Sequence, residues 1–249
     1  MSMPLFYLRR LTGSKRTESA NRHLARFLAF IAGAANAGGL LAVGQYTSHM
    51  SGIISAMADN IAIGGVSLAL TGLGAVCAFL AGAFLTTLMV RWARAHVLES
   101  EYALPLILES VLLVVFGLTG RVFVVGHAFL ETVMLLCFTM GLQNAIITKI
   151  SDAVIRTTHL TGMVTDIGIS LGRIASTWGH GDNQILDHEM TKLRLHSSLI
   201  ALFFAGGITG ALGFKHVGFL FTLPLAAVLL LLAVMPVVED VRRYRDIPA

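Results

Sequence analysis

Long apolar runs alternate with short polar gaps along most of the chain. A membrane-spanning helix needs about 20 mostly apolar residues. Six runs meet this requirement, at residues 27–44, 66–90, 104–120, 122–147, 195–214 and 217–238. The pattern therefore predicts an all-α polytopic membrane protein with six transmembrane helices.

Two further segments, residues 51–63 and 162–174, are shorter and more polar than the six runs. Each has about half the length of a span and combines small residues, hydroxyl residues and an aspartate. We predict that they are re-entrant or interfacial half-helices that enter and leave on one side of the membrane. Ser51 and Thr161 are expected to act as the N-caps of these helices, because a hydroxyl can accept a hydrogen bond from the first turn.

Composition supports the membrane class and excludes several others. Of the 249 residues, 55% are apolar and 13% are charged, whereas soluble domains carry about 25% charged residues. This composition is not that of a disordered chain, a nucleic-acid-binding protein or an ordinary soluble enzyme. The bilayer is the expected environment.

The basic residues choose between six and eight spans. If the two short segments do not cross, 16 of the 18 Lys and Arg residues lie on one side, and if both cross, 13 do. Since basic residues accumulate on the cytoplasmic side, we predict six spans with both termini cytoplasmic. The chain then divides into a basic tail (1–26), two membrane halves (27–121 and 122–238) and a C-terminal tail (239–249).

An internal repeat relates the two halves. The T-x-H-x-[ST]-G motif at residues 47–52 recurs at residues 157–162, a separation of 110. Three other pairs of segments match in the same order: 33–37 with 141–145, 79–83 with 203–207, and Pro105 with Pro224. Because each half has three spans, we expect the second half to be inverted relative to the first. Inverted repeats with interrupted helices are typical of transporters that bind solute where the halves meet.

The paired motifs and the G-x-x-N segments that precede them resemble the YoaK-type family of bacterial multi-pass membrane proteins. The resemblance extends over most of the chain, from about residue 27 to residue 238. It implies six spans and a location in the bacterial cytoplasmic (inner) membrane. The family has no agreed activity, so the resemblance assigns no role to any residue.

Eight polar residues in or near the two motifs are the candidates for solute binding. A histidine titrates near physiological pH, and acids within a membrane are costly enough to indicate function. The alternatives are structural: the histidines cap a bend, Asp59 lies at an interface, Asp166 pairs with Arg173, and the amides join helices. The candidate site residues are His49, Ser51, Asp59, His159, Thr161, Asp166, Asn36 and Asn144.

Two acids inside apolar runs, Glu109 and Glu131, have no acidic counterpart in the other half. We interpret them as interfacial residues, one of which can pair with Arg121; a role in carrying protons is the alternative. The small residues Ala78 and Gly82, and Gly206 and Gly210, are spaced for close helix packing.

These features favour a permease or secondary transporter for a small solute, with proton coupling as an option. A channel, a non-transporting scaffold and, last, a membrane-embedded enzyme remain alternatives. The chain has no known catalytic spacing, and we predict neither enzymatic activity nor a cofactor or metal. The expected partners are a small-molecule substrate and the lipid bilayer but no nucleic acid, and the small-residue faces also suit a homodimer.

Overall fold

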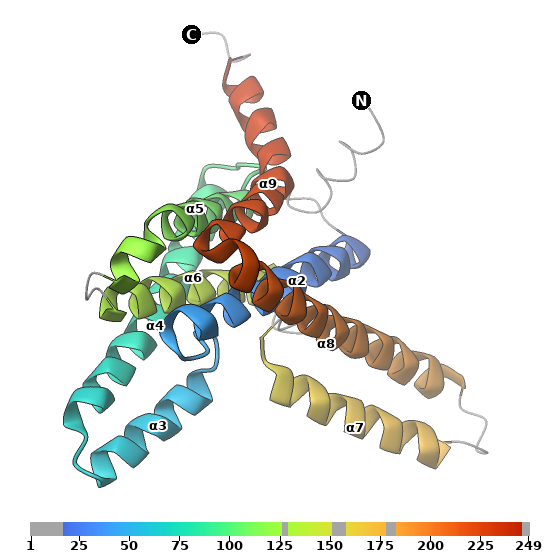
Figure 1. Cartoon of the computed structure of the whole chain (residues 1–249). Coiled ribbons are helices and arrows are strands. Elements are labelled where there is room, and N and C mark those ends of the chain that lie inside the picture. Colours follow the sequence, from blue (N-terminus) through green and yellow to red (C-terminus); the bar gives the residue numbers. More distant parts are fainter. Residues whose placement is uncertain (1–16, 126–128, 151–157, 178–182, 246–249) are drawn as a thin grey trace.

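Helices make up nearly all of the part of the chain that the structure describes. The computed structural model describes residues 17–125, 129–150, 158–177 and 183–245 (Figure 1). In chain order the elements are α2 (Glu18–Val43), α3 (Met50–Ala62), α4 (Val66–Ala95), α5 (Ala103–Val125), α6 (Phe129–Ile150), α7 (Leu160–Thr177), α8 (Asn183–Val217), the 3-10 helix η1 (Gly218–Phe221) and α9 (Thr222–Arg245).

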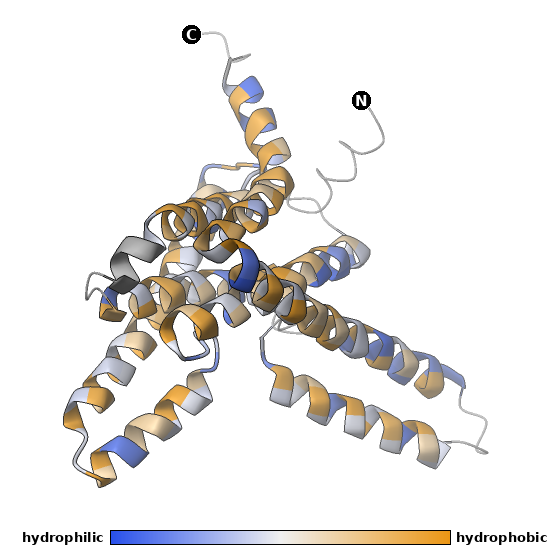
Figure 2. Ribbon diagram, viewed as in Figure 1, coloured by the Kyte–Doolittle hydropathy of each residue, from blue (hydrophilic) through white to orange (hydrophobic). Residues whose placement is uncertain are grey.

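The long helices have the length and hydropathy of membrane spans. Five stretches of the described chain qualify, and the last of them runs through α8, η1 and α9. Apolar residues cover most of these helices on their outer surfaces as well, as Figure 2 shows. An outward-facing apolar surface of this extent suits lipid, so the predicted fold class, an all-α polytopic membrane protein, is confirmed.

The element bounds differ from the prediction at the join between the two halves. Helix α5 continues to Val125, so the break expected at Arg121 falls inside its last turns. The four valine and phenylalanine residues after Arg121 include no Gly or Pro that would end a helix. The short helices α3 and α7 have nearly the expected places.

Helices α2 and α6 pack against each other in opposite directions. The Asn21 side-chain amide donates to the Ile150 carbonyl at 3.0 Å, and the Gln143 amide donates to the Leu28 carbonyl at 3.3 Å. A later position on α2 therefore meets an earlier position on α6. These are the first helices of the two halves, and the sequence match places corresponding positions 108 residues apart.

Helices α5 and α9, the last of each half, also run antiparallel. Ser110 Oγ donates to the Ala226 carbonyl at 2.8 Å, and Thr222 Oγ1 donates to the Leu113 carbonyl at 2.8 Å. Near the opposite ends, the Asp240 carboxylate accepts a hydrogen bond from the backbone N–H of Ser100 at 2.9 Å. Both pairs of corresponding helices thus have the relation that an inverted repeat requires.

The remaining long helices, α4 and α8, each pack on the first helix of the other half and run parallel to it. Arg26 Nε on α2 donates to Ser198 Oγ on α8 at 3.2 Å, and further along Gly38 lies against Phe214. Similarly, α4 packs along α6, where Thr86 Oγ1 donates to the Leu142 carbonyl at 3.3 Å. Since α2 and α6 are antiparallel, α2 and α4 run in opposite directions.

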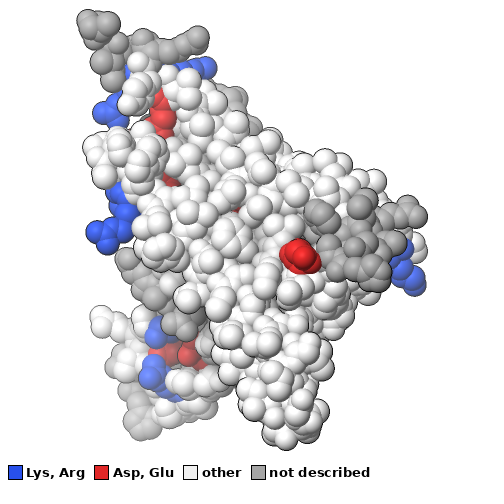
Figure 3. Space-filling view, turned by 90° about the vertical axis from the view of Figure 1, so that its left-hand side faces the viewer, with Lys and Arg blue, Asp and Glu red and all other residues white. Residues whose placement is uncertain are grey.

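Helices α3 and α7 each form a hairpin with the helix that follows. Helix α3 packs on α4, and α7 packs on α8. Figure 1 shows the two hairpins diverging from the bundle of long helices, α3–α4 on one side and α7–α8 on the other. Charged side chains lie mainly toward the margins of the face drawn in Figure 3, and one acidic group stands out among the uncharged residues near its middle.

Candidate functional site

The loop after α2 folds back onto its own helix. The helix ends at Gly44, which has a φ of 67°, a left-handed conformation that glycine adopts readily. Ser48 then donates from its backbone N–H (3.3 Å) and its hydroxyl (3.0 Å) to Oδ1 of Asn36, a buried residue nearly two turns before the end of α2. The first motif therefore begins within the depth of the bundle.

The same contact holds the second motif. Thr158 Oγ1 donates to Oδ1 of Asn144, while the Asn144 amide donates to the Met140 carbonyl of its own helix at 2.8 Å. Asn144 corresponds to Asn36, and Thr158 corresponds to Ser48, in the sequence repeat. Thr157, the first residue of this motif, lies outside the described residues.

Each motif histidine lies at the start of a short helix. His49 occupies the N-cap position of α3, and its carbonyl accepts from Ile53 N–H at 3.1 Å; the His159 carbonyl accepts from Met163 N–H at 3.1 Å. Both side chains are exposed. The motif glycines, Gly52 and Gly162, make room for the imidazoles, because a Cβ atom on either glycine would lie within 3.0 Å of Nδ1 of its histidine.

The expectation that Ser51 and Thr161 are N-caps is wrong. Helix α3 begins at Met50, one residue before the predicted segment, and α7 begins at Leu160, two residues before it, so both hydroxyl residues lie inside the first turn. Both side chains are exposed on the outside of the helix. The backbone carbonyl of Thr161 accepts from the hydroxyl of Thr165 one turn later, at 2.9 Å.

Small and hydroxyl residues form matching exposed faces on the two short helices. We call these the α3 face and the α7 face. The α3 face consists of Ser51, Ser55, Ala58 and Ala62, and the α7 face consists of Thr161, Thr165, Gly168 and Gly172. Both faces use the same helical spacing of four, three and four residues. The sequence analysis missed this pattern, although the spacing itself could have revealed it.

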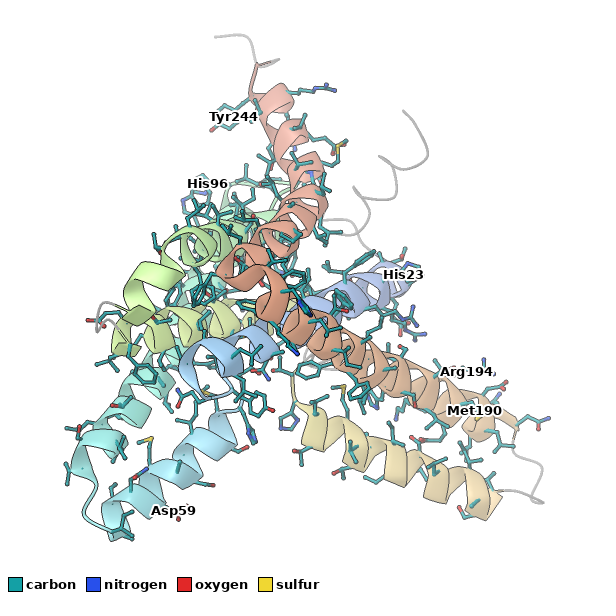
Figure 4. The ribbon with its side chains drawn as sticks, viewed as in Figure 1. His23, Asp59, His96, Met190, Arg194 and Tyr244 are labelled. Atoms are coloured by element: carbon teal, nitrogen blue, oxygen red, sulfur yellow. The ribbon has the colours of Figure 1, made fainter. Side chains whose placement is uncertain are left out.

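The two aspartates are exposed and lie away from the histidines along the short helices. Asp59 follows His49 by ten residues, about 15 Å of helix, and Figure 4 shows it near the far end of α3. Asp166 is exposed on α7. The suggested pairing of Asp166 with Arg173 is not seen; Arg173 instead forms an ion pair with Glu189 on α8 at 2.8 Å.

The two anchoring asparagines lie on either side of the point where α2 and α6 cross. Position 21 lies beside position 150, and position 28 lies beside position 143. By extension Asn36 is level with position 135 of α6, about nine residues or 13 Å from Asn144 along the helix axis. Each asparagine thus contacts the motif of its own half. The two motifs lie at different heights along the α2–α6 pair.

A cavity of about 530 Å³ lies elsewhere, between α2, α8 and α9. Its walls are mainly apolar, and the basic side chains of His23 and Arg26 also line it. None of the predicted site residues is among its lining residues. Figure 4 labels His23 on α2, close to the N-terminal end of that helix.

The α7–α8 hairpin carries a network of charged and polar groups outside the apolar part of α8. The buried Glu189 carboxylate accepts from Ser170 Oγ at 2.7 Å and from Arg173 at 2.8 Å, and Lys192 lies 4.0 Å away. The Ser170 hydrogen bond, followed by that from Arg173, lowers the pKa of Glu189 below its usual value. This network fastens α7 to α8.

Comparison with known proteins identifies the family. A family model described as "Protein of unknown function (DUF1275)" matches residues 24–235, which is most of the chain. The chain belongs to this family, whose function has not been characterised. No curated protein and no solved structure matches the chain.

Proposed function

We propose that the protein is a permease for a small solute, built as a 3+3 inverted repeat of six spans, with its site formed by the starts of α3 and α7. One observation carries the proposal. The same amide-to-hydroxyl contact, Asn36 with Ser48 and Asn144 with Thr158, holds an interrupted helix at corresponding positions on both sides of the α2–α6 crossing. Interrupted helices at a repeat interface are a recurrent design of transporter sites.

Helix directions support the six-span count. Since α2 and α4 run in opposite directions, the α3 segment between them returns to the side from which it started. The same reasoning applies to α7, between α6 and α8. The basic residues favour a cytoplasmic location for both termini, and we assign the protein to the bacterial cytoplasmic membrane.

The chemistry of the site suits a polar solute. A helix N-terminus carries unpaired backbone N–H groups and partial positive charge, and both short helices begin with an exposed histidine. The α3 face and the α7 face add hydroxyl groups and small residues that allow close approach. His49, Ser51, Asn36 and their counterparts form the core of this site, and Asp59 and Asp166 lie along the path to it.

Water access to the site is the first test. In a variant lacking the natural cysteines, we expect His49→Cys, His159→Cys and Asp166→Cys to react with a water-soluble thiol reagent, and Leu88→Cys, on the apolar surface of α4, to remain unreactive. Unreactive cysteines at all three site positions would contradict a water-filled pathway.

Transport is the second test. Cells expressing the protein and cells lacking it are compared for uptake across a panel of small polar solutes. For the solute found, His49→Ala combined with His159→Ala should abolish uptake at unchanged membrane abundance, and Leu88→Ala should not affect it. Retention of full uptake by the double variant would contradict the proposed site.

A further inference from the structure

The two halves of the protein are packed differently in one respect. Helix α5 packs along α6, whereas the corresponding helix α9 leaves the 530 Å³ cavity between itself, α2 and α8. Val228 of α9 lines this cavity and is 37% exposed. The spacing of 119 residues that relates Pro105 to Pro224 places Glu109 of α5 at the position of Val228, and Glu109 is 0% exposed.

Glu109 has no polar partner in this arrangement. Both carboxyl oxygens are buried without a hydrogen bond, so Glu109 does not have the interfacial position that was expected. The side chain of Arg121, the suggested partner of Glu109 or Glu131, lies outside the described residues. Among the described residues, including those of the helices packed on α5, no basic side chain lies within ion-pair distance of Glu109. The titratable or charged residues on those helices are Cys77, Arg91 and Arg94 on α4, Glu131, Cys137 and Lys149 on α6, and Glu239, Asp240, Arg242, Arg243 and Tyr244 on the described part of α9.

Burying an unpaired carboxylate in such a place is far more costly than burying the neutral acid. The buried, unpartnered position of Glu109 therefore favours the neutral acid over the carboxylate. A carboxylic acid kept inside a membrane helix despite this cost indicates a function that needs its charged form in another arrangement.

We propose that Glu109 is a proton-binding site that opens to water when the two halves exchange their packing, with α5 moving off α6 while α9 closes onto α2. In the open arrangement the carboxylic acid releases its proton to water and becomes a carboxylate. On closing, it takes a proton back from water. This proposal rests on the proposed transport function, because the exchange is the alternating-access movement of an inverted repeat.

After the exchange of packing, a cavity would form in the first half at the place that corresponds to the present one. Its charge would be opposite to that of the present cavity. His23 at the present cavity corresponds to Glu131, which is exposed at the start of α6, and Arg26 corresponds to Met134. A cavity at the corresponding place between α4, α5 and α6 would thus have an acid, Glu131, and no basic residue at these two positions. An acidic opening attracts protons and suits loading of Glu109.

The first test measures protonation directly on the unmodified chain. Dicyclohexylcarbodiimide reacts with protonated carboxyl groups in apolar surroundings, and peptide mass spectrometry locates the adduct. We expect an adduct at Glu109 that falls roughly tenfold for each pH unit above the titration midpoint and is absent in Glu109→Gln. Glu101, which is buried but ion-paired with Arg94 at 2.6 Å, is the matched control and should not react. No adduct at Glu109 over the whole pH range would overturn the proposal.

The second test measures opening. In a chain with Cys77 and Cys137 replaced by Ala, Glu109→Cys should react with a water-soluble thiol reagent at least tenfold faster than Leu113→Cys. Leu113 is also buried on α5, and its counterpart Leu232 is buried as well, so neither packing arrangement exposes it. Equal, slow reaction at both positions would overturn the proposal. If Glu109 forms the adduct but no solute is transported, the proton-binding site stands and the permease is contradicted. If a solute is transported but Glu109 forms no adduct, the permease stands and the proton-binding site is contradicted.

Discussion

A Cβ atom on Gly33 would lie within 3.0 Å of the carbonyl oxygen of Phe203, so α2 and α8 touch backbone to backbone. The corresponding pair in the other half, Gly141 and Phe79, has the same relation between α6 and α4. Gly206 against Phe30 and Gly82 against Phe138 complete the set of four contacts. The expectation that Gly82 and Gly206 serve close helix packing is confirmed.

Replacing Gly33 by Ala should destabilise the protein strongly. The added methyl group would meet backbone atoms, which cannot move aside as a side chain can, so we expect a loss above the usual overpacking cost of about 1–3 kcal/mol. The measurement is the midpoint of thermal unfolding in detergent.

Gly168→Ala is the matched control for that substitution. Gly168 is also a helical glycine, but a Cβ atom there would meet nothing within 4 Å. Alanine should leave stability unchanged or raise it by up to about 1 kcal/mol, because it favours the helix. Equal unfolding midpoints for the two variants would contradict the close packing of α2 on α8.

The hydrogen bonds between Asn36 and Ser48, which we call the anchor, should couple the effects of substituting the two residues on the free energy of unfolding. We expect Asn36→Ala to cost about 1–3 kcal/mol, because it leaves a partly buried donor without its acceptor. In a double-mutant cycle with Ser48→Ala, the coupling energy should be about 0.5–3 kcal/mol. Asn60→Ala, which removes an exposed amide bonded within its own helix, should change stability by a few tenths of a kcal/mol. A coupling energy near zero would contradict a structural role for the anchor.

Glu189 should make the stability of the α7–α8 hairpin depend on pH. Its pKa is lowered in the folded protein by Ser170 and Arg173, so its contribution is complete above the ordinary carboxyl pKa of about 4.3. The contribution is lost as the pH falls through the lowered pKa. Hydrogen exchange of α7 across this acidic range measures the effect, and Glu189→Gln should remove it. An unchanged pH profile in that variant would show that other acids are responsible.

The sequence predicts the long helices well because each apolar run is long enough to identify a span by itself. It also predicts that the motif regions and the helices around them correspond between the halves. The contact of Asn36 with Ser48 could not be predicted, because it depends on the loop after Gly44 folding back along α2. The role of Ser51 was misjudged because the N-cap of α3 is His49, two residues earlier, which places Ser51 inside the helix.

Other features depend on contacts between distant elements and leave no local pattern. The partner of Arg173, Glu189, is on the next helix, so spacing within α7 suggested Asp166 instead. The burial of Glu109 follows from the way α5 packs with α6 and α9. By contrast, the α3 face and the α7 face were readable from residue spacing alone, and a search for matched small residues would have found them.

The inverted arrangement of the two halves is tested most directly at the tips of the two hairpins. Ile63, which is 80% exposed beside the turn between α3 and α4, and Ser176, exposed near the end of α7, are replaced one at a time by Cys in a chain without other cysteines. Intact cells are treated with a thiol reagent that cannot cross the membrane. We predict that Ile63→Cys is labelled in intact cells and that Ser176→Cys is labelled only after the membrane is opened. Labelling of both positions from the same side would contradict the inverted repeat and restore eight spans in parallel halves.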